Sequence, residues 1–387
     1  MESNMKQVKV MSIFGTRPEA AKMVPLFLEL EECPQIDASI CVTAQHREML
    51  DQVLEPFGIK PQYDLDIMSR GQTLYDITTR VLTGLKEVFQ ETQPDLLLVH
   101  GDTTTTFVAS LAAFYAQLKV GHVEAGLRSY DKYQPYPEEM NRLLTTRLAD
   151  LHFAPTQDAR NKLLKENIPS TSIYVTGNTV IDMMKYTVNP NHQFLNEKLN
   201  DLDYSKRIIL MTAHRRENLG KPMENICRAV CRLLEDFPDT LLVWPVHPNP
   251  AVSEPAHRIL FDRERVVLIE PLDVRDLHNL MSRSYLVLTD SGGLQEEAPS
   301  LDKPVVVLRE VTERPEGLEA GTLTLVGTDE DKIYETTAHL LSDRVAYGQM
   351  AGKPNPFGDG KASERILQAI LFEYGLLAKR PREFQND

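Results

Sequence analysis

Short apolar runs alternate with longer segments of helical periodicity along most of the chain. The first run, Val8–Phe14, leads through a polar turn into residues 20–30, which have helical character. The run at residues 96–99 is almost wholly apolar, as expected of a strand that helices cover on both faces. This alternation predicts an α/β fold with parallel sheets. The other predicted strands are residues 38–43, 120–123, 149–154, 173–176, 207–212, 240–245, 266–269, 286–289, 303–308 and 323–326.

Helical spacing between these runs is clearest at residues 74–91, 223–237 and 362–377. A chain of 387 residues exceeds the usual size of one core, so we expect two domains. We place them at residues 1–178 and 179–361, with residues 362–387 carrying a last helix that packs back on the first domain. Residues 60–71 are predicted to form a loop.

The formal net charge of -14 argues against a nucleic acid or an anionic membrane surface as the main partner. No apolar run reaches the length needed to span a bilayer, and the first residues lack the apolar core of a signal peptide, so we expect a cytoplasmic protein. Neither a dinucleotide fingerprint nor a Walker-type loop is present, and we expect no NAD, ATP or metal cofactor. The cysteines are expected to be free thiols.

The predicted strand at residues 286–289 ends in Asp290-Ser291-Gly292-Gly293 and is followed by helix-forming residues. Backbone N–H groups at such a turn, with the helix dipole behind them, favour a phosphate or diphosphate. Ser291 adds a hydroxyl donor, and Glu297 falls one helical turn later, where its carboxylate can accept hydrogen bonds from sugar hydroxyls. The alternative is an ordinary turn whose glycines allow close packing.

A similar turn follows Val8–Phe14, with Arg17 and Lys22 close by in the sequence. An arginine at such a turn suits an anion, because its guanidinium can make a forked contact. His214 and Arg314 also follow predicted strands, and either can contact a phosphate. The alternatives are surface ion pairs for the arginines and a structural role for the histidine.

Carboxylates stand at two strand ends, Asp102 after residues 96–99 and Glu124 after residues 120–123. Glu138 follows in a proline-rich loop that enters a helix. Ligands of open α/β sheets bind at the carboxyl ends of the strands, so these carboxylates can converge on one ligand and serve in acid–base chemistry. The alternatives are helix capping for Asp102 and a favourable place at a helix N-terminus for Glu138.

Taken together, these motifs resemble those of the bacterial non-hydrolysing UDP-N-acetylglucosamine 2-epimerases. The resemblance spans residues 8–371. The matching runs are Phe14-Gly15-Thr16-Arg17-Pro18-Glu19-Ala20, Thr43-Ala44-Gln45-His46-Arg47, His100-Gly101-Asp102-Thr103-Thr104-Thr105, Gly121-His122-Val123-Glu124-Ala125-Gly126-Leu127-Arg128, Thr176-Gly177-Asn178-Thr179, His214-Arg215-Arg216-Glu217, Thr289-Asp290-Ser291-Gly292-Gly293 and Thr312-Glu313-Arg314-Pro315-Glu316.

The resemblance implies two Rossmann-like domains in the arrangement of B-type glycosyltransferases, with a UDP-sugar in the cleft between them, and usually a homodimer. It implies reversible epimerisation of UDP-GlcNAc to UDP-ManNAc at C2, by elimination of UDP to 2-acetamidoglucal and re-addition, which supplies ManNAc for cell-surface polysaccharide. The rival interpretations are a hydrolysing epimerase, a UDP-sugar glycosyltransferase of the same fold and a catalytically silent UDP-sugar sensor.

Carried over by position, the resemblance assigns a role to each matching residue. It makes Asp102, Glu124 and Glu138 catalytic carboxylates and His214 an essential histidine. The residues implied to contact the UDP-sugar are Arg17, Lys22, Asp102, Glu124, His214, Leu272, Leu277, Ser291, Gly292, Gly293, Glu297 and Arg314, with Glu297 on the ribose and the two leucines near the uracil. Some bacterial members bind a second UDP-GlcNAc as an activator. Gln45 and His46 match residues of that site, and Arg215 is expected to contribute to it. Glu48 and Gly71 depart from it.

Overall fold

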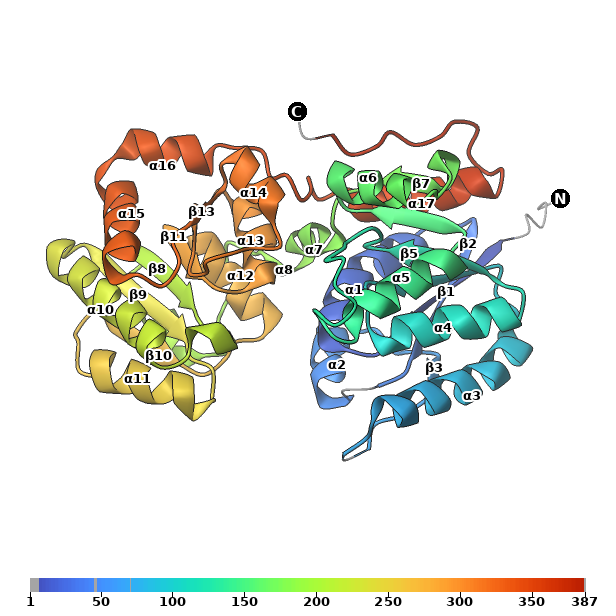
Figure 1. The fold of residues 1–387 in the computed structure, drawn as a ribbon, viewed down its shortest axis with the longest axis horizontal. Coiled ribbons are helices and arrows are strands. Elements are labelled where there is room, and N and C mark those ends of the chain that lie inside the picture. Colours follow the sequence, from blue (N-terminus) through green and yellow to red (C-terminus); the bar gives the residue numbers. More distant parts are fainter. Residues whose placement is uncertain (1–6, 45–46, 70, 386–387) are drawn as a thin grey trace. The chain divides into compact units, whose positions relative to one another are not determined.

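The computed structural model describes residues 7–44, 47–69 and 71–385. The chain divides into two compact units, with unit 1 formed by residues up to Tyr186 together with Gly358–Gln385, and unit 2 by Thr187–Phe357. Figure 1 shows each unit as a sheet flanked by helices. The corresponding boundaries predicted from the sequence stand after residues 178 and 361.

Unit 1 is built on a parallel seven-stranded sheet in the order β3-β2-β1-β4-β5-β6-β7. Its strands are β1 (Val8–Phe14), β2 (Ile36–Val42), β3 (Tyr63–Asp64), β4 (Leu96–His100), β5 (Lys119–Val123), β6 (Leu151–Ala154) and β7 (Ile173–Val175). Its helices are α1 (Arg17–Glu31), α2 (Arg47–Leu54), α3 (Leu74–Thr92), α4 (Thr104–Tyr115), α5 (Glu138–Leu148), α6 (Gln157–Lys165), α7 (Thr179–Asp182) and α17 (Ala362–Glu373).

Unit 2 repeats this plan with a parallel six-stranded sheet in the order β10-β9-β8-β11-β12-β13. Its strands are β8 (Arg207–Thr212), β9 (Thr240–Pro245), β10 (Val266–Ile269), β11 (Leu286–Thr289), β12 (Val305–Val307) and β13 (Leu323–Leu325). Its helices are α9 (Glu197–Asn200), α10 (Lys221–Asp236), α11 (Pro250–Leu260), α12 (Val274–Arg283), α13 (Gly292–Glu297), α14 (Pro315–Ala320), α15 (Glu330–Ser342) and α16 (Arg344–Ala351), while α8 (Met184–Thr187) crosses the division between the units.

The strand order reverses between β1 and β4 in unit 1 and between β8 and β11 in unit 2. This is the doubly wound order of Rossmann-like domains, whose ligands bind outside the carboxyl ends of the strands at the reversal point. The predicted α/β class with two Rossmann-like domains is therefore confirmed. Both predicted anion turns follow the strands that flank a reversal point, since Arg17 follows β1 and Ser291 follows β11.

Both sheets are buried by apolar side chains from their helices. In unit 1, Phe14 of β1 packs in one core with Phe27 and Leu30 of α1 and with Ile366 and Ile370 of α17. The last helix of the chain therefore packs on the first helix, as Figure 1 also shows by the place of α17 in unit 1. In unit 2 the only tryptophan of the sequence, Trp244, is fully buried in the core.

Several helices and strands were not predicted from the sequence. Residues 60–71 were expected to be a loop, but Tyr63–Asp64 adds a strand to the edge of the unit 1 sheet. Helices α6, α11 and α16 were not predicted, because each is short and α11 carries Pro250 and Pro255. The cysteines are free, as predicted, and Cys41, Cys227 and Cys231 are buried.

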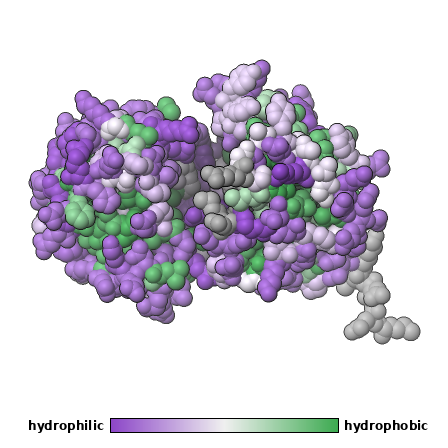
Figure 2. All heavy atoms as spheres, turned by 90° about the horizontal axis from the view of Figure 1, so that it is seen from below, coloured by the Kyte–Doolittle hydropathy of each residue, from purple (hydrophilic) through white to green (hydrophobic). Residues whose placement is uncertain are grey.

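Polar residues cover most of the surface seen in Figure 2, and apolar residues reach it in patches. Within the described residues, no helix is both long enough and apolar enough to cross a membrane.

Candidate active site

A buried carboxylate joins the two turns at the reversal point of unit 1. Glu19 accepts hydrogen bonds from the backbone N–H groups of Gly15 and Thr16, at 3.1 and 2.9 Å. It also accepts from the hydroxyls of Thr103 and Thr106, at 2.7 and 3.1 Å, at the start of α4. The same carboxylate completes the capping box of α1, so it fixes the β1–α1 turn against the β4–α4 turn. Burial raises the pKa of Glu19.

Asp102 stands just after β4 and is held from several sides. Its carboxylate forms an ion pair with Arg142 of α5, and its carbonyl oxygen accepts a hydrogen bond of 2.9 Å from the Asn141 amide. The preceding residue, Gly101, has a positive φ of 66°, and its carbonyl oxygen lies 2.7 Å from Nε2 of His122. Because a carbonyl only accepts, His122 donates there. Asp102 is thus placed by fixed backbone rather than by capping α4, since the N-cap of that helix is Thr103.

Glu124 follows β5 in the left-handed region, with a φ of 61°. Its Oε2 atom pairs with the ammonium of Lys22 from α1 and accepts a hydrogen bond of 3.1 Å from the amide of Asn178. Nε2 of His100, at the end of β4, lies 3.8 Å from the same oxygen. The side chain of Glu124 is only 11% exposed. A largely buried carboxylate with a lysine, an amide and an imidazole around it is a candidate for proton transfer.

The charges of these groups act on one another. Burial raises the pKa of Asp102, the Arg142 guanidinium opposes that shift, and the negative charge of Glu124 adds to it. Burial also lowers the pKa of His100 to about 4, so this imidazole is neutral at physiological pH. Asp102, Glu124 and Lys22 therefore form one electrostatic group at the carboxyl ends of β4 and β5.

Glu138 and Arg17 stand at the starts of helices α5 and α1. Glu138 is the first residue of α5, and its Oε2 atom is buried without a hydrogen-bond partner among the described residues. Its neighbour Glu139 instead accepts the backbone N–H groups of Ser129 and Tyr130, at 3.0 and 2.9 Å. Arg17, the first residue of α1, is half-buried. The catalytic role of Glu138 and the substrate contact of Arg17 stay predictions.

In unit 2, a fully buried aspartate organises the turn after β8. Asp290 accepts hydrogen bonds of 2.8 Å at Oδ2 from the backbone N–H groups of both His214 and Arg215. Its Oδ1 atom lies 3.3 Å from Nδ1 of His214. The ring of His247 stacks on that of His214 with centroids 5.8 Å apart. Burial lowers the pKa of His214, as do the charges of Arg215 and His247, whereas Asp290 raises it.

The Ser-Gly-Gly turn lies between two arginines. A methyl group added at Gly292 would stand 3.5 Å from the Arg314 guanidinium and 3.9 Å from that of Arg215. Arg314 is oriented by an ion pair with the buried carboxylate of Glu296. Ser291 is the N-cap of α13 and makes no capping hydrogen bond with its side chain. The turn therefore presents backbone N–H groups and two guanidinium groups close together, which suits a diphosphate.

Glu297, the last residue of α13, lies beside this turn. A methyl group added at Gly293 would come within 3.0 Å of its Oε1 atom. Its Oε2 atom is 3.3 Å from Nε2 of His278, whose Nδ1 lies 2.7 Å from the hydroxyl of Thr187. Leu272 is buried and Leu277 of α12 is half-buried. The ribose contact of Glu297 and the uracil contacts of the leucines stay predictions.

The residues predicted for an activator site are only partly described. Gln45 and His46 lie outside the described residues. Arg215 donates from its backbone N–H and from Nε to Asp290, the latter over 3.3 Å to the carbonyl oxygen. These bonds place Arg215 at the Ser-Gly-Gly turn, and its part in an activator site stays a prediction.

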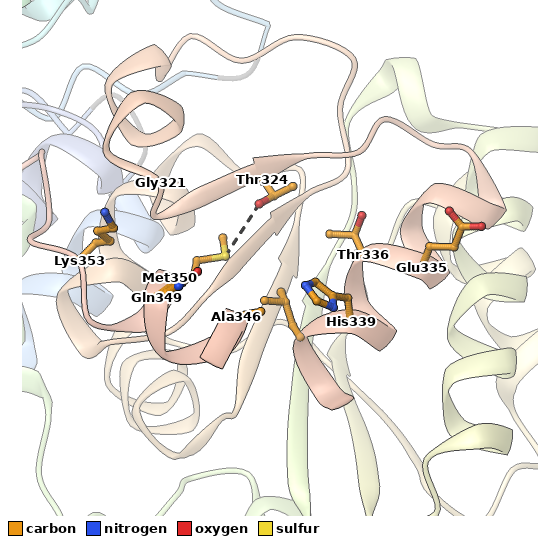
Figure 3. A pocket seen from close by; sticks show the side chains of 10 residues that line it. Gly321, Thr324, Glu335, Thr336, His339, Ala346, Gln349, Met350 and Lys353 are labelled. Carbon is orange, nitrogen blue, oxygen red and sulfur yellow. Dashed lines mark hydrogen bonds between the residues drawn. The ribbon is translucent and has the colours of Figure 1, made fainter. Parts of the chain in front are cut away.

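Figure 3 shows a cavity of about 580 Å³ elsewhere in unit 2, between β13 and helices α15 and α16. Its charged or titratable lining residues are Glu335, His339 and Lys353. No residue that the sequence analysis selected lines it, and we assign no role in the reaction to this cavity.

The residues that orient the selected side chains were not predicted from the sequence. Arg142 binds Asp102, and Asn178 binds Glu124. Asp290 contacts His214. Each lies in a segment that the motifs already contained or adjoined, but its partner stands 40, 54 or 76 residues away. The nearest signal in the sequence was the polarity of residues next to strand ends.

Comparison with known proteins supplies the family. The UDP-N-acetylglucosamine 2-epimerase family model matches residues 28–371. The UDP-N-acetylglucosamine 2-epimerase of Bacillus subtilis is 56% identical over 98% of this chain and 99% of its own length. The crystal structure of the UDP-GlcNAc 2-epimerase of Neisseria meningitidis bound to UDP-GlcNAc is 48% identical, with a TM-score of 0.82 over 94% of this chain and 100% of that one.

A more distant enzyme has the same fold. The UDP-GlcNAc 2-epimerase of Methanocaldococcus jannaschii, in complex with UDP-GlcNAc and UDP, is 33% identical, with a TM-score of 0.76 over 94% of this chain and 100% of that one. The family model and the identities cover most of the chain, and they agree with the carboxylates and the cationic turn found at the strand ends. The chain belongs to the UDP-N-acetylglucosamine 2-epimerase family of enzymes.

Proposed function

We propose that this enzyme interconverts UDP-GlcNAc and UDP-ManNAc by inverting C2 without net hydrolysis. The observation that carries the proposal is the group formed by Asp102, Glu124 and Lys22 at the carboxyl ends of β4 and β5. Carboxylates held partly out of water, with cations beside them, are suited to moving a proton at a weakly acidic carbon. The relatives that bind UDP-GlcNAc support the choice of substrate.

The proposed reaction is an elimination followed by an addition. A carboxylate takes the proton from C2 while the bond between C1 and the diphosphate oxygen breaks, which gives 2-acetamidoglucal and UDP. Addition of UDP to C1 and of a proton to the opposite face of C2 then completes the inversion. Asp102, Glu124 and Glu138 are the proposed proton carriers. Lys22 and Arg142 hold two of these carboxylates in place, so that the geometry is set before the substrate reacts.

The departing UDP is the proposed ligand of unit 2. The backbone N–H groups of Gly292 and Gly293 and the guanidinium group of Arg314 meet the negative charge that develops on the diphosphate, while Ser291, whose N–H is bonded to the Thr289 hydroxyl over 2.9 Å, offers its own hydroxyl. His214 stands at the end of the adjacent strand and serves the same group. Arg17 is a further proposed contact of the substrate. Glu297 is the proposed acceptor for the ribose hydroxyls.

The decisive test of the carboxylates separates turnover from binding. We expect Asp102→Asn and Glu124→Gln to lower kcat by about 10³-fold or more while changing UDP affinity by less than about tenfold, because they touch the proton transfer and not the diphosphate. Asp95→Asn is the matched control: Asp95 precedes the amino end of β4 and accepts the Lys9 N–H at 2.9 Å. A carboxamide variant with wild-type kcat would remove that residue from the reaction.

Product analysis separates the rival activities. A hydrolysing epimerase would release free ManNAc together with UDP. A glycosyltransferase would need an acceptor, and UDP would accumulate with turnover. A UDP-sugar sensor would bind the nucleotide sugar and leave it unchanged.

We also propose a homodimer formed through unit 1. Aromatic side chains of α3 and α4 lie on its surface, with Tyr75, Phe114 and Tyr115 85%, 59% and 67% exposed. Of these three, Tyr115 lines a cavity of about 720 Å³, together with residues of α3 that include Leu82 and Phe89. Exposed apolar patches of this kind are typical of interfaces. Tyr115→Glu should shift the mass measured by light scattering from dimer to monomer, and a wild-type mass near 44 kDa would contradict the dimer.

The proposal has three further parts. The enzyme is cytoplasmic, it supplies ManNAc for surface polysaccharide, and a second UDP-GlcNAc activates it. Sigmoidal dependence of the rate on UDP-GlcNAc would support the activator, whereas a hyperbolic dependence at every protein concentration would remove it.

A further inference from the structure

The two oxygen atoms of the Asp290 carboxylate have different surroundings. Its Oδ2 atom receives the backbone N–H groups of His214 and Arg215, both over 2.8 Å, and the side-chain amide of Asn218 over 2.9 Å. Its Oδ1 atom is buried and has no well-aligned hydrogen bond within the described residues. The ring atom that faces it is Nδ1 of His214, at 3.3 Å.

These contacts fix the direction in which Oδ1 points. Three donors converge on one oxygen, so the carboxylate cannot rotate without losing them. Asp290 is 0% exposed, and water cannot replace the lost partners. The side chain of His214 is 41% exposed, so its partners do not enclose the imidazole. The ring of His247 lies nearly parallel to it, at 13°, and restricts its tilt.

We propose that Asp290 is a positioning residue that holds the imidazole of His214 with its proton on Nδ1, leaving Nε2 for the diphosphate. An ionised carboxylate only accepts hydrogen bonds, so the contact with Oδ1 favours the Nδ1–H form of the ring. Nε2 then accepts a proton or, in the protonated ring, donates one, without loss of the Asp290 contact. The identity of the Nε2 ligand rests on the proposed function, whereas the proton on Nδ1 does not.

The substitution Asp290→Asn makes a directional test. Three N–H donors point at the Oδ2 position, so the introduced carboxamide must place its oxygen there. Its NH2 group then occupies the Oδ1 position and donates to Nδ1 of the imidazole, which moves the ring proton to Nε2. The variant therefore reverses the tautomer while keeping the shape and the backbone contacts.

The measurement is a long-range ¹H–¹⁵N correlation spectrum of the full chain labelled with ¹⁵N-histidine, without substrate, at pH 7.5. His214 is assigned by the loss of its signals in His214→Gln. We expect a protonated Nδ1 and an unprotonated Nε2 in the wild type, and the reverse in Asp290→Asn. Asn218→Ala is the matched control: it removes a donor to the same Asp290 oxygen and does not touch the ring, so the wild-type tautomer should remain.

Kinetics supply a second readout. A reversed tautomer should lower kcat by about 10²-fold or more, whereas Asn218→Ala should lower it by less than about tenfold. The groups that face His214 are Asp290, Arg215 and His247, and of these Asp290 raises its pKa. Asp290→Asn removes that negative charge and should therefore lower the pKa of His214. The part of the pH–rate profile that reports the titration of His214 should move to lower pH.

A wild-type ring with its proton on Nε2, or an unchanged tautomer in Asp290→Asn, overturns the proposal. Should Asp290→Asn fail to fold, the wild-type spectrum alone still decides where the proton lies. Should the enzyme prove not to epimerise UDP-GlcNAc, the spectra still test the role of Asp290, because no substrate is present.

Discussion

Replacing the buried His152 with Gln should weaken the dependence of the stability of unit 1 on pH. His152 lies in β6 and is 2% exposed. Burial lowers its pKa to about 4, and the charges of Arg128 and Arg147 act in the same direction. The unfolded chain binds a proton near the ordinary pKa of 6.5, whereas the folded chain does not. Lowering the pH below 6.5 therefore favours the unfolded state.

The magnitude follows from this difference in proton binding. Between pH 7.5 and 5.5, an unfolded histidine of pKa 6.5 gains about 1.4 kcal/mol from protonation, and a folded one of pKa about 4 gains almost nothing. Buried carboxylates such as Glu19 and Asp102, whose pKa values are raised, act in the opposite direction, because the folded state binds their protons more tightly. The prediction therefore concerns the difference between wild type and His152→Gln.

The assay must report on unit 1 alone. The only tryptophan, Trp244, lies in β9 of unit 2, so its fluorescence does not serve. Native-state hydrogen exchange of peptides from β4, β5 and β6, corrected for the intrinsic exchange rate at each pH, gives the free energy of opening of this sheet. We expect the loss of stability between pH 7.5 and 5.5 to be smaller in His152→Gln than in wild type by about 1.3 kcal/mol.

Equal pH dependence in the two proteins would refute the reasoning, because it would mean that His152 is protonated equally in both states. A lower stability of His152→Gln at both pH values would not refute it, because a buried amide lowers the free energy of unfolding equally at each pH.

Three further predictions concern the turns. Gly15→Ala should destabilise unit 1 by about 2 kcal/mol or more, as measured by hydrogen exchange. The added methyl group would lie 1.9 Å from the Thr43 hydroxyl. Gly348→Ala is the control and should be neutral or stabilising, because open space surrounds Gly348. Glu19→Ala should lower the free energy of unfolding by about 3 kcal/mol, because the N–H groups of Gly15 and Thr16 lose their acceptor. Glu19→Gln should lower it much less, and equal losses in the two variants would contradict this prediction. Arg314→Ala should raise the Kd for UDP by calorimetry about 10- to 100-fold, with Arg228→Ala on α10 unchanged; an unaltered Kd would remove Arg314 from the diphosphate site.

The sequence predicted the strands best where apolar runs end abruptly. The bounds of β1, β8, β9 and β10 agree with the predicted ranges. The inner strands β1, β8 and β9 are mostly apolar because helices cover both faces of the sheet, and the edge strand β10 is apolar although it is mostly half-buried. Helix α11 was missed because prolines interrupt its pattern, although Pro250 at its start is favourable. β3 was missed because two residues, paired only to Cys41 and Val42, carry no periodicity.

The candidate site was predictable only in part. Asp102, Glu124, His214 and Ser291 could be selected because they follow strands, and parallel strands bring their carboxyl ends to one edge. The partners of these residues could not be selected, since Arg142 reaches Asp102 from α5 and Asn178 reaches Glu124 from the N-cap of α7. Such contacts depend on helix packing and side-chain direction, which local sequence does not encode.

Proton exchange at C2 is the most direct test of the proposed reaction. The measurement is proton NMR of the purified enzyme with UDP-GlcNAc in deuterated water, without added NAD. The account predicts UDP-ManNAc with deuterium at C2 and no free ManNAc. Free ManNAc, UDP-ManNAc that retains the original C2 proton, or a substrate spectrum that stays unchanged despite binding would contradict it.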